Sequence, residues 1–308
     1  MTGSVTPGPH GGDVERVAAA LGRPVSDVLD LSASLNPLAP DTRPVLRAAL
    51  DEVGRYPDDA RATAALAEAM GVDPSRLVLT NGGAEAIALV ARHRPVGWAD
   101  ACEFSLYRRH LDRLDPAGPR WRSDPHNPTG SLAPSDDIAD VRDEAFYLLA
   151  TGTWTRGDRG VTVLGSLTKA WAVPGLRIGY VLARDDRDAD AIRALRPRWS
   201  VNGLVCAALP ALLDLADPTG WRDGIAALRA ELRALLARHG LRADPSDAAY
   251  VWVPSARGVR DRLLPEGVVV RHGGSFGHPD AVRIAVPDAD GLERLDRALT
   301  VTDHRSDP

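Results

Sequence analysis

The residues with the clearest chemical meaning surround Lys169, the single lysine of the sequence. The 37 lysine and arginine residues therefore include 36 arginines. A guanidinium stays protonated at any working pH, whereas a desolvated lysine amine can lose its proton and attack a carbonyl to form a Schiff base. One alternative is a lysine left over by drift in an arginine-rich chain. The neighbouring residues favour the first interpretation, in which Lys169 performs covalent chemistry on a carbonyl group.

The neighbours of Lys169 suit a phosphate group. Ser166 and Thr168 place two hydroxyls beside the amine, and Arg177 follows behind a Pro-Gly turn. Two hydroxyl donors and a bidentate guanidinium can converge on one phosphate. A phosphorylated aldehyde cofactor fits this set of residues.

A second phosphate-binding pattern lies upstream. Residues 77–80 read as a short apolar strand, and a glycine turn then leads into a helix that runs to Arg92. Glycines let the backbone approach an anion closely, and the first free amides of a helix point towards it. Most glycine turns merely connect elements. Combined with the residues around Lys169, however, this turn makes Gly83 and Ala84 candidates for binding the cofactor phosphate.

The stretch 166–180 resembles the lysine motif of fold-type I pyridoxal-phosphate enzymes, in the branch of threonine-phosphate decarboxylases and histidinol-phosphate aminotransferases. The likeness comprises hydroxyl-x-hydroxyl-Lys followed by Gly-Leu-Arg-Ile-Gly-Tyr. The resemblance implies pyridoxal 5'-phosphate as the cofactor, bound covalently by Lys169, with Ser166, Thr168 and Arg177 on its phosphate. It also implies an α/β fold with a large, mainly parallel-sheet domain and a small α+β C-terminal domain.

Other motifs of this family occur in the family's order. Phe104 belongs to a segment whose first aromatic stacks on the pyridine ring, although a place in the core is the alternative for it. Asn127 lies in an Asn-Pro-Thr-Gly turn and is expected to bind the cofactor's phenolic oxygen and the substrate. Asp143 opens an Asp-Glu-Ala segment whose Asp pairs with the ring nitrogen. A carboxylate keeps that nitrogen protonated, and the protonated ring stabilises a carbanion at the substrate's Cα. Asp143 and Lys169 are therefore the expected catalytic pair.

The candidate substrate-binding residues lie near the two ends of the chain. His10-Gly11-Gly12 and the Ser-Ala-x-x-Asn-Pro segment that contains Asn36 resemble the opening of threonine-phosphate decarboxylases, in which His-Gly and the Asn contact the phosphorylated amino acid. The His-Gly-Gly element is not usual in histidinol-phosphate aminotransferases. Arg283 resembles the family's arginine for the substrate's α-carboxylate, and Arg271 the one that contacts its phosphate. A solvent-facing Arg283 is the alternative, because charged residues in strands usually face water.

The segment Arg55-Tyr56-Pro57 resembles one whose tyrosine reaches the cofactor phosphate of the neighbouring subunit. The resemblance therefore implies a homodimer in which Tyr56 completes the partner's site. A packed aromatic residue beside a turn is the alternative.

Bulk composition limits the other classes of function. Hydrophobic residues at 44% and charged residues at 26% are ordinary for a globular protein, and a net charge of −5 gives no general attraction to nucleic acid or to an anionic membrane. The first residues show no signal-peptide pattern, and no segment is long enough to span a bilayer, so we expect a cytoplasmic protein. Cys102 and Cys206 are expected to be reduced thiols, and no metal site is expected.

The element pattern suggests three regions: an N-terminal arm (1–40) that contributes to the small domain, a large cofactor-binding domain (41–195), and the small domain (196–308). Helices are predicted at 43–53, 60–70 and 221–239, strands at 249–253, 268–271 and 282–286, and an exposed connection at 184–190. Only short stretches separate Tyr107, Asn127 and Asp143. The large domain has therefore lost connecting structure, and which strands persist is open.

We predict an enzyme that acts on a phosphorylated amino acid. The His10 segment favours a threonine-phosphate decarboxylase, which serves the aminopropanol branch of cobalamin biosynthesis, and a histidinol-phosphate-type aminotransferase is the alternative. A third hypothesis is a protein that binds the cofactor but no longer turns over. The retention of Lys169, Asp143, Asn127 and both arginines, Arg177 and Arg283, favours an enzyme.

Overall fold

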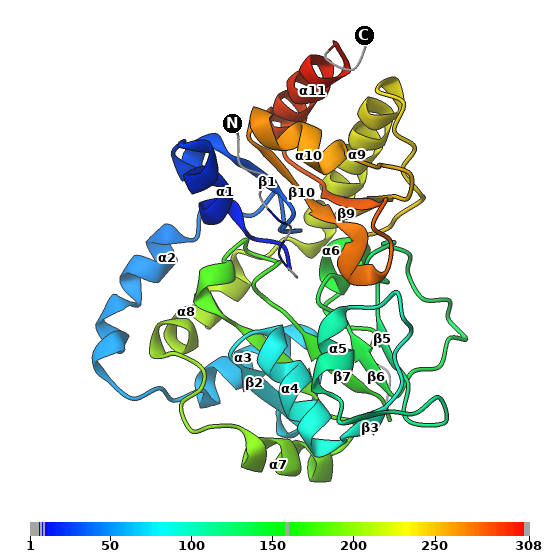
Figure 1. Cartoon of the computed structure of the whole chain (residues 1–308). Helices are drawn as coiled ribbons and strands as arrows, with labels where there is room; N and C mark the ends of the chain where they lie inside the picture. The colour runs from blue at the N-terminus through cyan, green and yellow to red at the C-terminus, as the bar shows by residue number, and fades with distance from the viewer. Residues whose placement is uncertain (1–5, 7, 9, 158–159, 305–308) are drawn as a thin grey trace.

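Two sheets covered by helices organise the chain, as Figure 1 shows. The computed structural model describes residues 6, 8, 10–157 and 160–304. Short apolar strands alternate with helices that carry one apolar face, and such elements bury their apolar surfaces by packing in layers. The expected α/β class is confirmed.

The larger sheet, within the described residues, has five strands. Their order is β2 (Leu77–Thr80), β8 (Gly179–Leu182), β7 (Thr162–Gly165), β6 (Val141–Asp143) and β5 (Trp121–Ser123). Strand β8 runs antiparallel to its two neighbours, whereas β5, β6 and β7 are parallel. Ser123, Asp143 and Gly165 thus end three parallel strands at one edge. In open α/β sheets, ligands bind outside this carboxyl edge.

A separate two-stranded sheet lies beyond β5. Strands β3 (Val96–Gly97) and β4 (Arg113–Leu114) pair in parallel, and Trp98 makes a parallel bridge to Arg120 just before β5. Each of these two strands has two residues.

Helices cover both faces of the larger sheet. One face packs against α4 (Gly83–His93), α5 (Ser105–His110) and α7 (Asp186–Leu195). The other face packs against α3 (Ala60–Met70), α6 (Tyr147–Thr151), α8 (Gly203–Asp214) and the first half of α9 (Pro218–Arg238). Strands β2, β7 and β8 are buried along their whole length, as expected for a sheet covered on both sides.

Two sequence-based expectations in this region need correction. Most of residues 184–190 are exposed as expected, but they are not only a connection, because α7 begins at Asp186. Asp185 caps this helix by accepting a hydrogen bond from Asp188 N, and Asp188 is buried against Arg94. The helix predicted at 43–53 ends early: α2 spans Arg43–Ala48, and Leu50–Gly54 continues as a 3₁₀ helix.

Helix α9 belongs to both lobes. Trp221 and Ile225 pack into the core of the larger sheet, whereas Leu232, Leu235 and Leu236 pack into that of the smaller sheet. Helix α8 also lies in the core of the larger sheet. The large lobe therefore extends past residue 195, and the chain crosses to the small lobe within α9.

The smaller sheet has the order β1 (Leu29–Leu31), β10 (Val268–His272), β11 (Val282–Ala285) and β9 (Tyr250–Val253). The N-terminal arm joins this lobe, because β1 pairs with β10 and α1 (Val14–Leu21) packs on Val269. Helices α9, α10 (Val259–Leu263) and α11 (Ala289–His304) cover the side that carries Val251, Val270 and Ile284. Side chains alternate along a strand, so Tyr250, Trp252, Arg271 and Arg283 point to the opposite side.

No helix in the described part of the chain is long and apolar enough to cross a membrane.

Candidate active site

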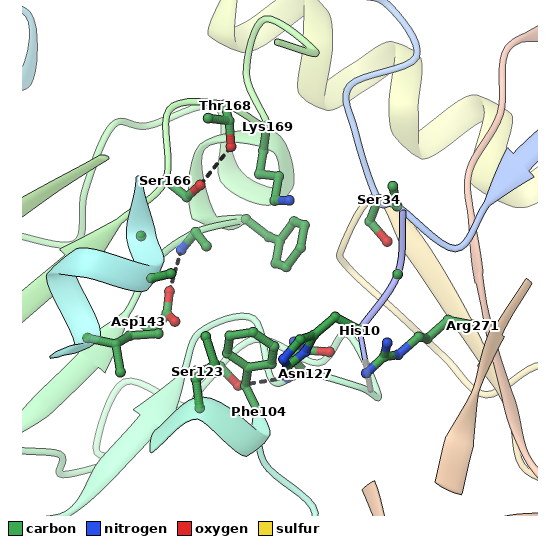
Figure 2. A pocket seen from close by; sticks show the side chains of 18 of the residues that line it. His10, Ser34, Phe104, Ser123, Asn127, Asp143, Ser166, Thr168, Lys169 and Arg271 are labelled. Carbon is green, nitrogen blue, oxygen red and sulfur yellow. Dashed lines mark hydrogen bonds between the residues drawn. The ribbon is translucent and has the colours of Figure 1, made fainter. Parts of the chain in front are cut away.

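A cavity of about 220 Å³ lies at the carboxyl edge of the larger sheet, where the smaller sheet and the N-terminal arm close over it. Figure 2 shows Lys169 reaching into this space, with Ser166 and Thr168 behind it and His10, Asn127 and Arg271 across from it. The wall consists of His10, Gly11, Ser32, Ala33, Ser34, Gly83, Ala84, Ile87, Phe104, Leu106, Tyr107, Ser123, Asn127, Asp143, Ala145, Phe146, Ser166, Thr168, Lys169, Arg177, Arg271, Phe276 and Arg283.

One end of the cavity is lined by hydrogen-bond donors, here called the donor cup: the hydroxyls of Ser166 and Thr168, the start of α4 and the guanidinium of Arg177. Ser166 Oγ and Thr168 Oγ1 are 2.9 Å apart, and α4 begins beside them at Gly83. Gly82, at φ 80°, adopts a backbone conformation that favours glycine, and a Cβ there would collide with the guanidinium of Arg177. The guanidinium therefore lies directly against the helix start. Free helix amides, two hydroxyls and a cation together form an anion site.

Lys169 extends from the turn after β7, and its Nζ lies 5.7 Å from the centre of the Phe146 ring. Burial, together with the charges of Arg283 and Arg177 and against the opposing effect of Asp143, lowers the pKa of this amine from 10.5 to about 8. A substantial neutral fraction is thus present near neutral pH. The amine is prepared for attack on a carbonyl carbon.

Asp143 ends β6 and is held from two sides. Its Oδ2 accepts a hydrogen bond from Tyr107 Oη at 2.7 Å, and its Oδ1 accepts one from Ala145 N at 2.9 Å. Burial raises the pKa of this carboxyl, although both hydrogen bonds and the charge of Lys169 oppose the rise. A cationic partner in the cavity would relieve this burial cost.

Asn127 has a fixed orientation. Its Oδ1 accepts a hydrogen bond from Arg283 Nη1 at 2.6 Å. Because a guanidinium can only donate, the oxygen must face Arg283, and the NH₂ group must face elsewhere. Since Asn127 lines the cavity, this NH₂ group is a donor for a ligand.

Arg271 and Arg283 face each other across β10 and β11 and are 4% and 7% exposed. Arg283 lies 4.7 Å from the centre of the Tyr250 ring and donates to Ser32 O, while Arg271 donates to Ser275 Oγ. Like charges directly opposite one another on adjacent strands are unfavourable. The pair therefore generates a strong positive field at this wall of the cavity.

Comparison with known proteins agrees with this geometry. The model of the family described as aminotransferase class I and II matches residues 123–299, more than half of the chain. The chain belongs to this family. Its members are pyridoxal-phosphate enzymes, and this chain is therefore a pyridoxal-phosphate-dependent enzyme of the aminotransferase or decarboxylase kind.

Individual relatives of this aminotransferase-family chain span almost its whole length. It is 28% identical to histidinol-phosphate aminotransferase 1 of Dechloromonas aromatica over 353 aligned residues, which cover 96% of this chain and 97% of that protein. The alignment is longer than the 308 residues of the chain, so the relative carries additional residues.

Two solved structures share the fold. Histidinol-phosphate aminotransferase of Sinorhizobium meliloti, in complex with pyridoxal 5'-phosphate, has a TM-score of 0.83 at 20% identity and covers 98% of this chain and 95% of that chain. L-threonine-O-3-phosphate decarboxylase of Porphyromonas gingivalis has a TM-score of 0.77 at 19% identity, covering 90% and 100%.

The cavity of this aminotransferase-family chain fits pyridoxal 5'-phosphate. The donor cup suits the phosphate, Lys169 is placed for the aldehyde, and Asp143 is a buried carboxylate available to a ring nitrogen. Asn127 presents an NH₂ donor that suits a phenolic oxygen. The donor set thus matches the distinct polar groups of the cofactor.

The structure brings together nearly all of the residues selected from the sequence. Phe104, half-buried, lines the cavity beside His10, with ring centres 5.7 Å apart, so it is a wall residue as well as a core contact. Arg283 is buried, which excludes the solvent-facing alternative.

Two selected residues lie outside the cavity wall. Asn36 Nδ2 donates to Ala170 O, and Asn36 N donates to Lys169 O, so this side chain ties the N-terminal arm to the lysine turn. Tyr56 is 78% exposed and stacks on Trp199 at 4.4 Å, away from its own chain's cavity. Within one chain Tyr56 therefore contacts an aromatic ring but is not buried.

Sequence reasoning missed Ser34 and Tyr107. Ser34 is 1% exposed and lines the cavity, and its Oγ has no hydrogen-bond partner among the described residues. Ser34 lies beyond the end of β1, and since Ser32, Ala33 and Ser34 all line the cavity, no strand alternation singles it out. Tyr107 lies three residues after Phe104, in the segment that resembles the family's ring-stacking element. Its hydrogen bond to Asp143 joins elements that are far apart in the sequence, so the sequence does not reveal it.

Proposed function

We propose that this enzyme acts on a phosphorylated amino acid, as a threonine-phosphate decarboxylase-like enzyme. The observation that carries the proposal is the buried, cross-strand pair Arg271 and Arg283 with His10 beside it, opposite the cofactor's phosphate cup. Burial is the main cause that lowers the pKa of His10, and the charges of Arg271 and Arg109 add to it against the opposing charge of Asp13. A substrate with both a carboxylate and a phosphate would neutralise the charges of the two arginines.

The chain's own residues divide the chemistry among them. When bound, the cofactor supplies an electron sink for the negative charge that develops at the substrate's Cα. Asp143 holds the proton on the ring nitrogen that makes this sink effective. Arg283 binds the α-carboxylate, and Lys169 carries a proton to or from Cα at Nζ. In decarboxylation the bond from Cα to the carboxylate breaks, carbon dioxide leaves, and a proton takes its place.

The N-terminal arm supports the decarboxylase assignment. Gly11 packs against Ser32, where a Cβ would collide with the Ser32 carbonyl, and Gly12 N donates to Ser32 Oγ at 2.9 Å. These contacts hold the His10-Gly11 pair in the cavity wall. Transamination of histidinol phosphate is the second candidate, because the relative described above is a histidinol-phosphate aminotransferase.

Two parallel assays separate these functions. The first incubates the holoenzyme with phosphothreonine and measures carbon dioxide and aminopropanol phosphate. The second supplies histidinol phosphate with 2-oxoglutarate and measures glutamate. We expect the first to give product at a rate that His10→Ala lowers. Product only in the second assay would replace the decarboxylase assignment by the aminotransferase one.

We also propose a homodimer in which Tyr56 of each chain binds the cofactor phosphate of the other. The exposed position of Tyr56 supports this, as do the exposed apolar side chains near it, Leu50, Val53 and Trp199. A second copy that covers these side chains would remove apolar surface from water and bring the hydroxyl to a partner's site.

A further inference from the structure

We propose that Glu103 is a positioning residue that acts through Ser123 to fix Asn127 against the cofactor. The proposal requires the bound cofactor but is independent of which phosphorylated amino acid is the substrate. Glu103 directly precedes Phe104, which lines the cavity. Neither Glu103 nor Ser123 was expected from the sequence to bind the cofactor or the substrate.

Glu103 joins two parts of the cavity wall through three hydrogen bonds. It is 2% exposed, its Oε1 accepts from Ser123 N at 3.1 Å, and its Oε2 accepts from Ser123 Oγ at 2.6 Å. Its Oε2 also accepts from Phe104 N at 3.3 Å. The carboxylate thereby connects the segment before α5 to the end of β5. A buried carboxylate with three donors is a fixed part of the wall.

The hydrogen bonds run in series from Asn127 through Ser123 to Glu103. Asn127 N donates to Ser123 Oγ at 2.7 Å, so this oxygen already accepts a hydrogen. An ionised Glu103 can only accept hydrogen bonds, so in that state the Ser123 hydroxyl hydrogen points to Glu103 Oε2. A glutamine at position 103 presents an NH₂ group to at least one of these donors and breaks the chain at that point.

This series of hydrogen bonds orients Asn127, whose side chain faces the ligand. The backbone of Asn127 is held by Ser123, its Oδ1 is held by Arg283, and Tyr250 Oη donates to the carbonyl of His126 at 3.1 Å. With these atoms fixed, the NH₂ group of Asn127 has a single direction into the cavity. Without the Ser123 bond, the turn keeps only its other anchors, and a displacement of about 1 Å weakens a ligand hydrogen bond severely.

The surroundings of Glu103 favour hydrogen bonds to this side chain over an ion pair with it. Burial, to which the charge of Asp143 adds and which the three donors oppose, raises the pKa of Glu103 to about 8. His126 is a basic group close to Glu103, with Nε2 3.8 Å from Oε1, and burial lowers the pKa of that imidazole. Glu103 is thus held mainly by hydrogen bonds and not by a fully charged partner.

The test compares Glu103→Gln, Ser123→Ala and the double variant as holoproteins. The readout is the pH titration of the bound cofactor's visible absorbance, followed with no substrate present. A donor at the phenolic oxygen favours the deprotonated form of the cofactor, so a displaced Asn127 raises the titration midpoint. We expect upward shifts of about 0.5 to 1 pH unit in each single variant, the size of a partly lost hydrogen bond.

The double variant and a control make this test specific. Because both residues act in one chain of bonds, the double variant shifts the midpoint no further than the larger single shift. Ser105→Ala removes a nearby hydroxyl outside the cavity wall and leaves the midpoint unchanged. If Glu103→Gln does not fold, Ser123→Ala alone decides, since it adds no new polar group.

An unchanged midpoint in folded, cofactor-loaded Ser123→Ala overturns the proposal, as does an equal shift in Ser105→Ala. Inactivity of the wild-type enzyme on phosphothreonine affects only the substrate assignment, because the absorbance readout needs the cofactor alone.

Discussion

Lys169 and Asp143 share one cavity, and burial moves both side chains towards their neutral forms. The pKa of the amine falls to about 8, and the pKa of the carboxyl rises. For Lys169 this shift creates the nucleophile. For Asp143 burial makes the ionised form costly, so the carboxylate gains from any cation placed beside it, and the protonated ring of the cofactor would be such a cation.

Asp143→Asn is expected to retain the cofactor but to lower turnover by roughly 10²–10³-fold, the cost typical of losing one preorganised electrostatic partner. An amide cannot hold the ring nitrogen protonated. Steady-state kinetics with the cofactor content measured on the same samples checks this. Glu144→Gln is the matched control, because Glu144 is the adjacent buried carboxylate and accepts from Arg156 N instead of lining the cavity. Near-normal turnover in Asp143→Asn would assign the role to another carboxylate.

The shifted pKa of Lys169 predicts how the apoprotein takes up cofactor. The neutral amine is the attacking form, so the rate of covalent uptake rises with pH and levels off above a pH of about 8. Stopped-flow absorbance after mixing apoprotein and cofactor measures this rate. A rate that climbs up to the ordinary lysine pKa of 10.5 would mean that burial does not perturb the amine.

At the scale of helices and strands, His239 joins the end of α9 to α11. Its Nδ1 lies 2.6 Å from Asp303 Oδ2, and its Nε2 lies 2.8 Å from Asp296 Oδ1. Burial lowers the pKa of His239, but the hydrogen bonds to Asp303 and Asp296 outweigh burial and raise it above 6.5. These contacts stabilise the small lobe most when the imidazole is charged.

His239→Gln is therefore expected to destabilise the protein in a pH-dependent way. Because the folded pKa exceeds the unfolded one, the contribution is fully present below pH 6.5 and is lost as pH rises through the folded pKa. Both carboxylates are over 40% exposed, so solvent screening limits the effect to about 0.5–1 kcal/mol. Denaturant unfolding of both proteins across this pH range measures the difference. A constant difference, or one that grows with pH, would contradict the charged contact.

Elements with a clear apolar period were predictable, whereas those stabilised by distant partners were not. Helix α3 and strand β2 occupy the predicted residues, because their buried positions follow the sequence pattern. Helix α7 was missed, since its polar residue Asp188 is buried by Arg94 and Arg184, which no local pattern reveals. In the site, Lys169 and Asp143 carry their chemistry in the residue type, but the network from Glu103 to Asn127 exists only in three dimensions.

At the scale of the whole molecule, the cavity depends on two lobes and on the N-terminal arm. The large lobe provides the donor cup and Lys169, and the small lobe provides Arg271 and Arg283. Helix α9 packs in both cores and thereby fixes one lobe against the other. The proposed dimer would add Tyr56 from a second chain to this assembly.

Subunit mixing tests the shared site. Tyr56→Phe and Lys169→Ala chains each form defective homodimers, but in a heterodimer one site receives both defects and the other receives neither. We expect mixing to restore activity, up to one intact site in each heterodimer. Activity no higher than that of the separate variants, with exchange confirmed by native mass spectrometry, would place Tyr56 in its own chain's site or outside any site.

The most direct measurement concerns Lys169 itself. Borohydride reduction of the holoprotein, followed by peptide mapping, is predicted to place the cofactor on the peptide that contains Lys169, and no other lysine exists to compete. Lys169→Arg keeps the charge but cannot form the bond, so it is predicted to abolish both the label and the visible absorbance. A wild-type protein without the label, or a Lys169→Arg variant with an unchanged spectrum, would contradict the account.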